Sequence, residues 1–434
     1  MKILSIVAGV LLMMGCRQQS NNKDFSAEDI SRVIAEMTNI MVHDVTNPPL
    51  ASRFFSYACL SGYEVISQNK EDVVSMHGRL TGYPLLKKQD TIQGYSYQLA
   101  AILAMMETAK KMQPSGKLLD TYEKRFLDSC GKAGWDQDKI VASKKYAIAI
   151  SREILSYARK DLYNRISNYP RYTPLGKEGY WYPTPPAYIA AVEPYFKTLR
   201  PFTLDSSTQF KPEPPVPFSI QKSSSFFKMM MQNYEDSLSN EKKLIAAYWD
   251  CNPFAVQDNG HLLVGLKKIS PGAHWLGITG IVCKSDKKNF DEAMQIHTAV
   301  SIGLMDAFIC CWEEKYKSNR IRPETAIRKY IDPTWQPFLQ TPPFPEYVSG
   351  HSTISAASAT ILGHYFGENF SFRDTVEMTY GLPARNFKSF KQAAQEAAIS
   401  RFYGGIHFMD AIDNGFRQGE KIGSWVLKKL GKEL

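Results

Sequence analysis

The sequence has few of the features that mark a zinc-binding, membrane-spanning or nucleic-acid-binding protein. Its 434 residues include seven cysteines, with no CxxC pair and no cysteine and histidine spacing suited to zinc. Beyond the first sixteen residues, no apolar run reaches the ~20 uninterrupted residues that a spanning helix needs. The net charge is +9, but lysine and arginine are spread along the chain without an arginine-rich run. The sequence therefore predicts a soluble body with no nucleic-acid partner and a mild attraction for anions.

The first sixteen residues are typical of an export signal. Lys2 precedes an apolar run from Ile3 to Met14, which ends at Gly15 and Cys16. A Gly-Cys pair followed by RQQSNNKD resembles a bacterial lipoprotein signal, in which this cysteine is acylated after cleavage. An ordinary signal peptide or an uncleaved anchor is the alternative. Both interpretations predict an exported protein, and the first predicts a membrane-anchored lipoprotein in the periplasm or at the cell surface.

The remaining cysteines and most of the histidines have ordinary interpretations. The six later cysteines lie mostly in apolar helical contexts, so buried thiols are favoured over disulfides. Asp306 is expected to face solvent, because it lies nine residues before Lys315 on the same predicted helix. The histidines without a ligand spacing, which are expected at core or surface positions, are His43, His77, His261, His274, His297 and His364.

Helical periodicity dominates both halves of the chain and predicts an almost entirely α-helical fold. Apolar residues recur at helical spacing from Ala27 to about Ser167, and again from Ser223 onwards. Proline, tyrosine and tryptophan crowd the stretch between, which predicts a long ordered loop that could roof a site. The expected organisation is a signal peptide over 1–16, an N-terminal helical region over 17–168, a connecting loop over 169–217 and a catalytic helical domain over 218–434.

Three short segments, far apart in the sequence, carry the residue types that an oxyanion site needs. They are KYKSNRIRP from Lys315 to Pro323, EYVSGHS from Glu346 to Ser352, and SRFYGGIH from Ser400 to His407. A tetrahedral anion in a partly dry pocket needs several fixed donors, because each uncompensated charge is costly to desolvate. The segments are therefore expected to meet around one anion.

The donors fall into two groups. Lys315, Arg322 and Arg401 supply positive charge, and each arginine can hold two oxygens at once. Ser349 and Gly350 precede an apolar helical run, so the hydroxyl and the backbone amide should lie at a helix N-terminus, where anions are favoured.

Two histidines accompany these donors. His351 follows on the same turn as Gly350 and can act as a general acid or base. His407 lies six residues after Arg401, beyond the Gly404-Gly405 break, where it can be a nucleophile or an apical ligand.

Together these segments resemble the superfamily that unites vanadium-dependent haloperoxidases, type-2 phosphatidic acid phosphatases and bacterial acid phosphatases. The family pattern is a Lys, six residues and Arg-Pro, then Pro-Ser-Gly-His, then Ser-Arg, five residues and His. Lys315 with Arg322 and Arg401 with His407 keep these spacings, and the middle element differs only by Val348 in place of Pro. The motifs cover about 90 residues and the general resemblance perhaps the last 220.

The resemblance implies a helical bundle of the vanadium haloperoxidase and acid phosphatase type, with an additional N-terminal helical region. It also implies roles for the motif residues. His351 would be the acid or base, and His407 would bond the central atom. The residues expected to hold the oxygens are Lys315, Arg322, Ser349, Gly350 and Arg401.

Three functions follow from the resemblance. A haloperoxidase would carry vanadate on His407 and use peroxide to oxidise a halide to hypohalous acid, and the extended helical region favours this branch. An acid phosphatase would need no cofactor and would hydrolyse phosphate mono- or diphosphate esters through a phosphohistidine at His407. A catalytically silent, anion-binding surface lipoprotein is the third alternative, against which the intact His351 and His407 argue.

The partner that orients His407 is left open by the sequence. Relatives commonly place an Asp four residues after the last His, but this chain has Ala411 there. Asp410 and Asp413 are the nearest candidates to fix the tautomer of the histidine.

Overall fold

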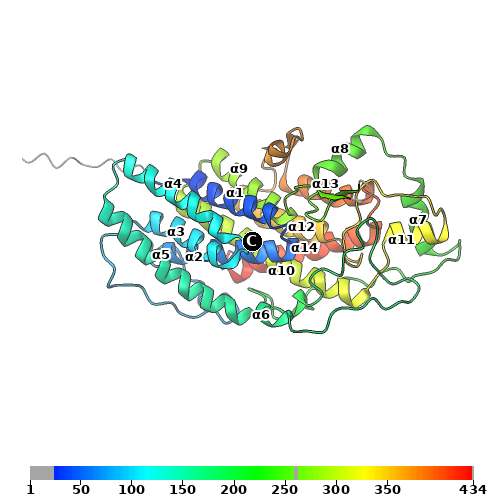
Figure 1. The fold of residues 1–434 in the computed structure, drawn as a ribbon, viewed down its shortest axis with the longest axis horizontal. Helices are drawn as coiled ribbons and strands as arrows, with labels where there is room; N and C mark the ends of the chain where they lie inside the picture. The colour runs from blue at the N-terminus through cyan, green and yellow to red at the C-terminus, as the bar shows by residue number, and fades with distance from the viewer. Residues whose placement is uncertain (1–23, 259–261, 433–434) are drawn as a thin grey trace, which may run out of the picture.

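The computed structural model describes residues 24–258 and 262–432, and it is mostly helical (Figure 1). The predicted all-α fold is confirmed, whereas the predicted signal and Cys16 lie outside the described residues. The α-helices are α1 (Ala27–His43), α2 (Pro48–Ser67), α3 (Tyr97–Met112), α4 (Leu119–Lys132), α5 (Gln137–Ala158), α6 (Tyr163–Ile166), α7 (Ser225–Glu235), α8 (Asn240–Tyr248), α9 (Pro271–Ser285), α10 (Phe290–Ser318), α11 (Pro323–Tyr330), α12 (Gly350–Phe366), α13 (Phe390–Tyr403) and α14 (Met409–Lys429).

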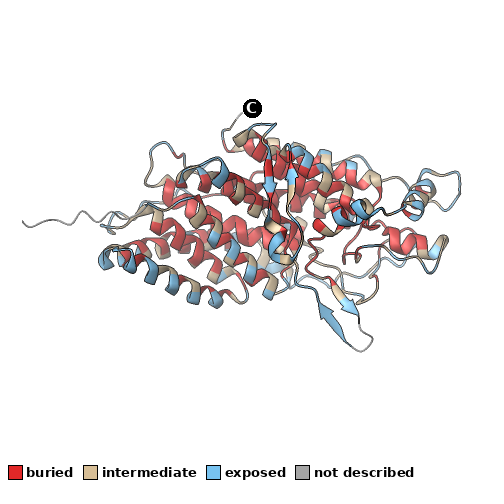
Figure 2. Cartoon of the chain, turned by 90° about the horizontal axis from the view of Figure 1, so that it is seen from above, coloured by how far each residue is buried: buried red, intermediate tan, exposed pale blue. Residues whose placement is uncertain are grey.

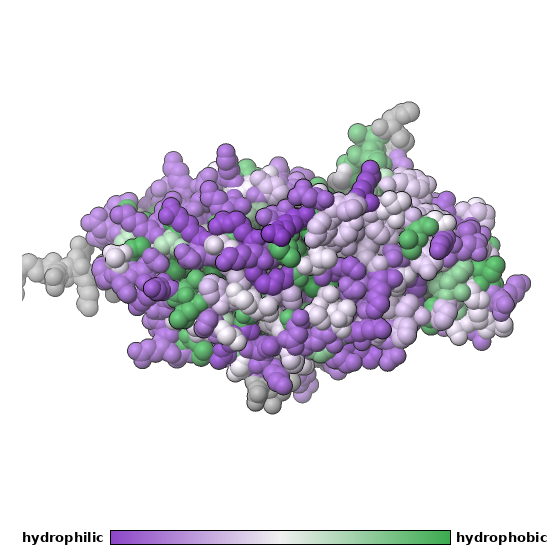
Figure 3. Space-filling model, turned by 90° about the horizontal axis from the view of Figure 1, so that it is seen from below, coloured by the Kyte–Doolittle hydropathy of each residue, from purple (hydrophilic) through white to green (hydrophobic). Residues whose placement is uncertain are grey.

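Short elements connect these helices. The 3-10 helices are η1 (Gly116–Leu118), η2 (Arg159–Asp161), η3 (Phe196–Thr198) and η4 (Val376–Tyr380). Two antiparallel hairpins pair β1 (Val256–Asp258) with β2 (Leu263–Gly265), and β3 (Phe372–Asp374) with β4 (Arg385–Phe387). The β1–β2 hairpin projects from the body and is largely exposed (Figure 2). Apolar side chains gather on this projection, on a face that is otherwise largely hydrophilic (Figure 3).

Helix α10 joins the two ends of the molecule and carries the first site residue. It begins with a capping box between Asn289 and Glu292, and its last turn holds Lys315. It packs against both α2 and α12 (Figure 1). One hydrophobic core runs through both predicted regions. By length and composition α10 could cross a membrane, but 94% of its most apolar window is buried inside the protein. In this structure it is the core helix of the fold.

Asp306 on α10 is fully buried, so the expectation that it faces solvent was wrong. Its carboxylate accepts hydrogen bonds from the Phe202 amide at 2.7 Å and from the Thr203 amide at 2.8 Å and hydroxyl at 2.6 Å. Burial raises the pKa of Asp306 to about 6. Because every residue of α10 from Ile296 to Trp312 is buried, the carboxylate of Asp306 has no access to solvent and anchors the long connecting loop.

The connecting loop is ordered and lies behind the site. The Trp181 amide donates to the Asn319 carbonyl at 2.7 Å, and the Ile321 amide donates to the Gly179 carbonyl at 3.0 Å. Trp181 is buried, whereas Tyr182 is exposed. The loop therefore braces the segment between the first lysine and arginine of the motif and does not line the pocket.

Helices α12 and α14 lie in backbone contact. A Cβ atom on Gly415 would be 2.8 Å from the Ser349 carbonyl oxygen, and one on Gly423 would be 2.8 Å from the Ala357 carbonyl oxygen. Side chains of any size would therefore separate the helices. Ser349 is the N-cap of α12, and α14 begins directly after the His407-Phe408 pair. The contact sets the distance between the second and third motif segments.

Candidate active site

Lys315 lies at the buried end of α10, under the segment that leads into α12. Its ammonium group donates to the carbonyl oxygens of Pro345 at 3.0 Å, Glu346 at 3.0 Å and Val348 at 2.5 Å. Burial, and to a lesser extent the nearby Arg322, lowers the pKa of Lys315 to about 7. The lysine thus fixes the backbone before the motif serine. To contact an anion directly, its ammonium group must replace one of these hydrogen bonds to a carbonyl oxygen with one to the anion.

Arg322 is fully buried and reaches the last motif histidine. Its Nε donates to the Phe344 carbonyl at 2.9 Å, and its Nη1 donates to the Ile406 carbonyl at 2.9 Å. The same Nη1 lies 3.1 Å from His407 Nε2. The Nη2 atom is buried and has no partner. Burial lowers the pKa of Arg322 to about 9, so this guanidinium lacks the counter-charge that it would prefer.

Glu346, which the sequence analysis did not select, orients His407. Its Oε1 lies 2.8 Å from His407 Nδ1 and accepts from the Phe408 amide at 3.0 Å. A carboxylate at Nδ1 places the proton there and leaves a lone pair on Nε2, which faces Arg322. Burial lowers the pKa of His407 well below its usual value, and Arg322 and Lys315 lower it further. We infer that the imidazole is neutral and that Nε2, which accepts from Arg322 Nη1 here, can bond a central atom in place of this contact.

Neither aspartate proposed as the partner of His407 contacts it. Asp410 binds Arg320, whose Nη1 and Nη2 donate to its two oxygens at 2.6 and 2.7 Å. Arg320 Nε in turn donates to Glu346 Oε2 at 2.6 Å, so Asp410 acts on the histidine only through two intermediates. Asp413 is exposed and lies outside this network. The structure therefore corrects the expected partner to Glu346.

The second motif segment starts α12. Ser349 is buried and accepts from the Ser352 amide at 3.3 Å, which caps the helix. Gly350 and His351 occupy the first turn, whose amides have no partner within a helix. Burial is the main cause that lowers the pKa of His351 well below its usual value, and the positive charge of Arg401 is the next largest cause. His351 Nε2 is buried and has no hydrogen-bond partner.

Arg401 approaches from α13 on the opposite side. It is only 1% exposed, and its Nη1 donates to the Trp249 carbonyl at 2.9 Å. Asp250 Oδ1 lies 3.9 Å from Nη2, beyond hydrogen-bond reach, and Arg401 Nε has no partner. Burial lowers the pKa of Arg401.

Buried cations and unpaired nitrogens are the main property of this site. Lys315, Arg322 and Arg401 are at most 1% exposed, and burial lowers the pKa of each. The unpaired nitrogens are Arg322 Nη2, Arg401 Nε and His351 Nε2. An unpaired buried polar group costs about 1–3 kcal/mol, and more when it is charged. A tetrahedral oxyanion would supply the missing acceptors and charge, so the residues present fit such a group.

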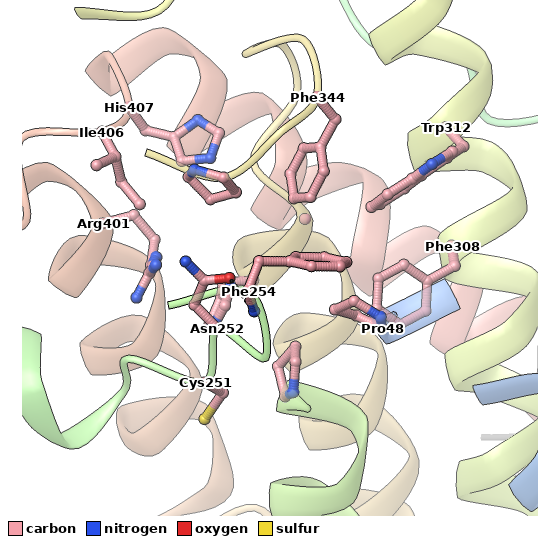
Figure 4. A pocket seen from close by; sticks show the side chains of 14 residues that line it. Pro48, Cys251, Asn252, Phe254, Phe308, Trp312, Phe344, Arg401, Ile406 and His407 are labelled. Atoms are coloured by element: carbon pink, nitrogen blue, oxygen red, sulfur yellow. Dashed lines mark hydrogen bonds between the residues drawn. The ribbon is translucent and has the colours of Figure 1, made fainter. Parts of the chain in front are cut away.

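A pocket opens beside these residues, and Gly350, His351, Arg401 and His407 line it. In Figure 4, Arg401 and His407 lie on one side and Trp312 faces them from α10. Most of the remaining wall comes from segments without a motif and could not be predicted from the sequence. These lining residues are Pro48, Cys251, Asn252, Phe254, Pro271, Phe308, Trp312, Pro342, Phe344 and Ile406.

The lowered pKa of Lys315 predicts that anion binding depends on pH. Its pKa of about 7 makes Lys315 largely neutral above pH 7 in the free protein, whereas a bound dianion favours the charged form. Binding must then take up a proton, so affinity should fall by up to about tenfold per pH unit from pH 7 to 9. Calorimetric titration with tungstate should show this slope of log affinity against pH. In Lys315→Met the slope should be smaller by up to one, because binding takes up one proton fewer. Equal slopes would contradict the assignment.

Comparisons with known proteins point to one family. The family model described as the VCPO second helical-bundle domain matches residues 331–433. The crystal structure of a bacterial vanadium-dependent iodoperoxidase is 41% identical, with a TM-score of 0.87 over 94% of this chain and 97% of that chain. The holo-type structure of a bacterial vanadium-dependent chloroperoxidase has a TM-score of 0.67 at 14% identity, over 89% of this chain and 93% of that chain, which shows a shared fold. The comparison with curated proteins finds no match.

Proposed function

Because the chain belongs to the family of vanadium-dependent haloperoxidases, it is an enzyme of halide oxidation, and we propose that it binds vanadate in this pocket and prefers iodide. The observation that carries the proposal for vanadate is the set of buried cations with unpaired nitrogens around His407 Nε2. Two observations support iodide. The chain is 41% identical to an iodoperoxidase, and the pocket wall opposite Arg401 is aromatic. Iodide is the largest of the three halide ions, so it loses the least hydration free energy when it leaves water to contact such a wall.

Each residue has a distinct task in this proposal. Arg322 and Arg401 would neutralise and hold the vanadate oxygens, with the first amides of α12 as further donors. His407 Nε2 would bind the vanadium, because Glu346 keeps the proton on Nδ1. Vanadate bound there supplies the activation of hydrogen peroxide toward a halide. His351 Nε2 can take up or return a proton, because no protein group occupies it.

The proposal is tested by measuring oxidation and hydrolysis on the same preparation. The purified protein is loaded with orthovanadate and given hydrogen peroxide with iodide, bromide or chloride, and p-nitrophenyl phosphate is offered in a parallel reaction. Iodide oxidation should exceed bromide oxidation, depend on vanadate and disappear in His407→Ala. His364→Ala is the matched control, because His364 lies in the last turn of α12, away from the pocket.

Two outcomes would overturn the proposal. Phosphate release that vanadate inhibits, without halide oxidation, would favour the phosphatase interpretation. Activities no higher than those of His407→Ala would favour an anion-binding protein without catalysis.

We also propose that the protein is exported and lipid-anchored through Cys16. The support is the sequence pattern of residues 1–16 alone, which lie outside the described residues. Metabolic labelling with a fatty-acid analogue should mark the wild type and not Cys16→Ser. Equal labelling of the two would contradict this proposal.

A further inference from the structure

A second cluster of buried functional groups lies beside the pocket, on segments that the haloperoxidase motif does not include. Cys251 follows α8, His274 lies in the first turns of α9, and Glu377 belongs to η4. The side chains of His274 and Glu377 are 0% and 8% exposed, and Cys251 is 2% exposed. One atom of each residue lies within 4.8 Å of the others. Three segments far apart in sequence thus bring a thiol, an imidazole and a carboxylate to one buried point.

The orientation of His274 matches that of a metal-bound histidine. Its Nε2 lies 2.7 Å from Asp374 Oδ2, so the ring can donate there and expose the Nδ1 lone pair on the other side. Metal-bound histidines almost always make such a bond to a carboxylate with the second nitrogen. Nδ1 then faces Glu377 Oε1 at 3.0 Å and Cys251 Sγ at 3.6 Å.

The three distances fit a tetrahedral metal ion. Usual zinc bond lengths give edges of about 3.6 Å for sulfur to nitrogen, about 3.6 Å for sulfur to oxygen and about 3.4 Å for nitrogen to oxygen. The observed edges are 3.6 Å, 3.7 Å and 3.0 Å, in the same order. Only the pair of His274 Nδ1 and Glu377 Oε1 would have to open, by about 0.4 Å.

Charge balance points in the same direction. Asp374 and Glu377 are two carboxylates in the interior, and within the described ranges the only ion-pair partner of either is His274. Without a metal, the ring needs a proton on each nitrogen to donate to both carboxylates, and the Cys251 thiol lies 3.7 Å from Glu377 Oε1. A divalent cation would replace the Nδ1 proton and the thiol proton and bind all three side chains.

We propose that Cys251, His274 and Glu377 form a binding site for a divalent cation with the ligand preferences of zinc, next to the vanadate site, whose pocket wall also includes Cys251. On binding, the Cys251 thiol and His274 Nδ1 each lose a proton to solvent, a metal–sulfur bond and a metal–nitrogen bond form, and His274 Nε2–H keeps donating to Asp374. Three protein ligands leave a fourth position, which a water molecule fills.

The ion would act on the pocket through Trp249. The indole ring of Trp249 stacks on His274 at 4.6 Å between centroids. The backbone carbonyl of Trp249 accepts a hydrogen bond from Arg401 Nη1. A metal that links Cys251 to α9 would therefore stiffen the short segment that positions the arginine.

The experiment uses the full-length protein, stripped with a chelator under a reductant and then titrated with zinc or cobalt. One equivalent of zinc per chain should remain after desalting and raise the melting temperature. Cobalt should give a thiolate-to-metal charge-transfer band that Cys251→Ser abolishes. Cys283→Ser is the matched control, since Cys283 is also a buried free thiol and lies on α9 outside the cluster.

Three results would overturn the proposal. They are less than stoichiometric metal in the wild type, a cobalt spectrum without the thiolate band, and equal loss of metal in both cysteine variants. The band is read on folded protein without vanadate, so the outcome does not depend on halide oxidation.

Discussion

The His351→Ala variant should oxidise halide roughly 10²–10⁴-fold more slowly than the wild type and still bind vanadate. The reason lies in what this side chain contacts. Its Nε2 is buried beside the pocket without a partner, whereas the arginines and the amides of α12 supply the charge and donors for the anion. Removing the ring should therefore remove proton transfer and leave most of the binding energy. Steady-state rates and vanadate titrations on the same preparation measure the two effects separately.

The control for this variant is His364→Ala, on the same helix and half-exposed, which should retain wild-type rates. If vanadate affinity falls in His351→Ala by the same factor as the rate, His351 holds the anion and is not the proton carrier. An unchanged rate would remove it from the mechanism.

The second large effect is expected for Glu346→Gln, which should weaken vanadate binding by about 10- to 100-fold. Glu346 accepts from His407 Nδ1 and so keeps the lone pair on Nε2. An amide can donate as well as accept, so glutamine lets the histidine adopt either tautomer. The dissociation constant should rise more than the rate at saturating vanadate falls, and titration of the stripped protein measures it.

Asp410→Asn is the matched control for Glu346→Gln. Both substitutions remove one carboxylate from Arg320, and breaking a buried ion pair typically costs about 3–5 kcal/mol, so both proteins should melt at lower temperature. Only Glu346 touches the histidine, so Asp410→Asn should keep its vanadate affinity within a few-fold. Equal loss of affinity in the two variants would show that Glu346 acts through stability alone.

The sequence was sufficient for the parts of the site that depend on local spacing. Ser349 and Gly350 start a helix because a capping residue precedes an apolar run, and this is a local property. The lysine, arginine and histidine spacings resemble those of a known family. The structure places Arg401 and His407 on one pocket, with Arg322 3.1 Å from His407 Nε2.

The rest of the site depends on tertiary structure. Glu346 lies in an irregular segment, so its direction toward His407 could not be derived from periodicity. Asp306 was misplaced for the opposite reason, because helical spacing shows which residues share a face and does not show that every face is covered. Pro48 and Cys251 also line the pocket. Pro48 lies hundreds of residues before the first motif segment in the sequence, and Cys251 lies tens of residues before it.

The glycine contact between α12 and α14 bears on how closely the anion site can be reproduced from one molecule to the next. Where two backbones are in contact, there is no side chain whose rotamer could change the separation of the helices. The distance from Ser349 to His407 is therefore set by the backbone and does not vary with side-chain motion. The distance between the two parts of the site therefore depends on positions that have no side chain. Replacing one of these glycines with a larger residue would change this distance without altering any group that contacts the anion.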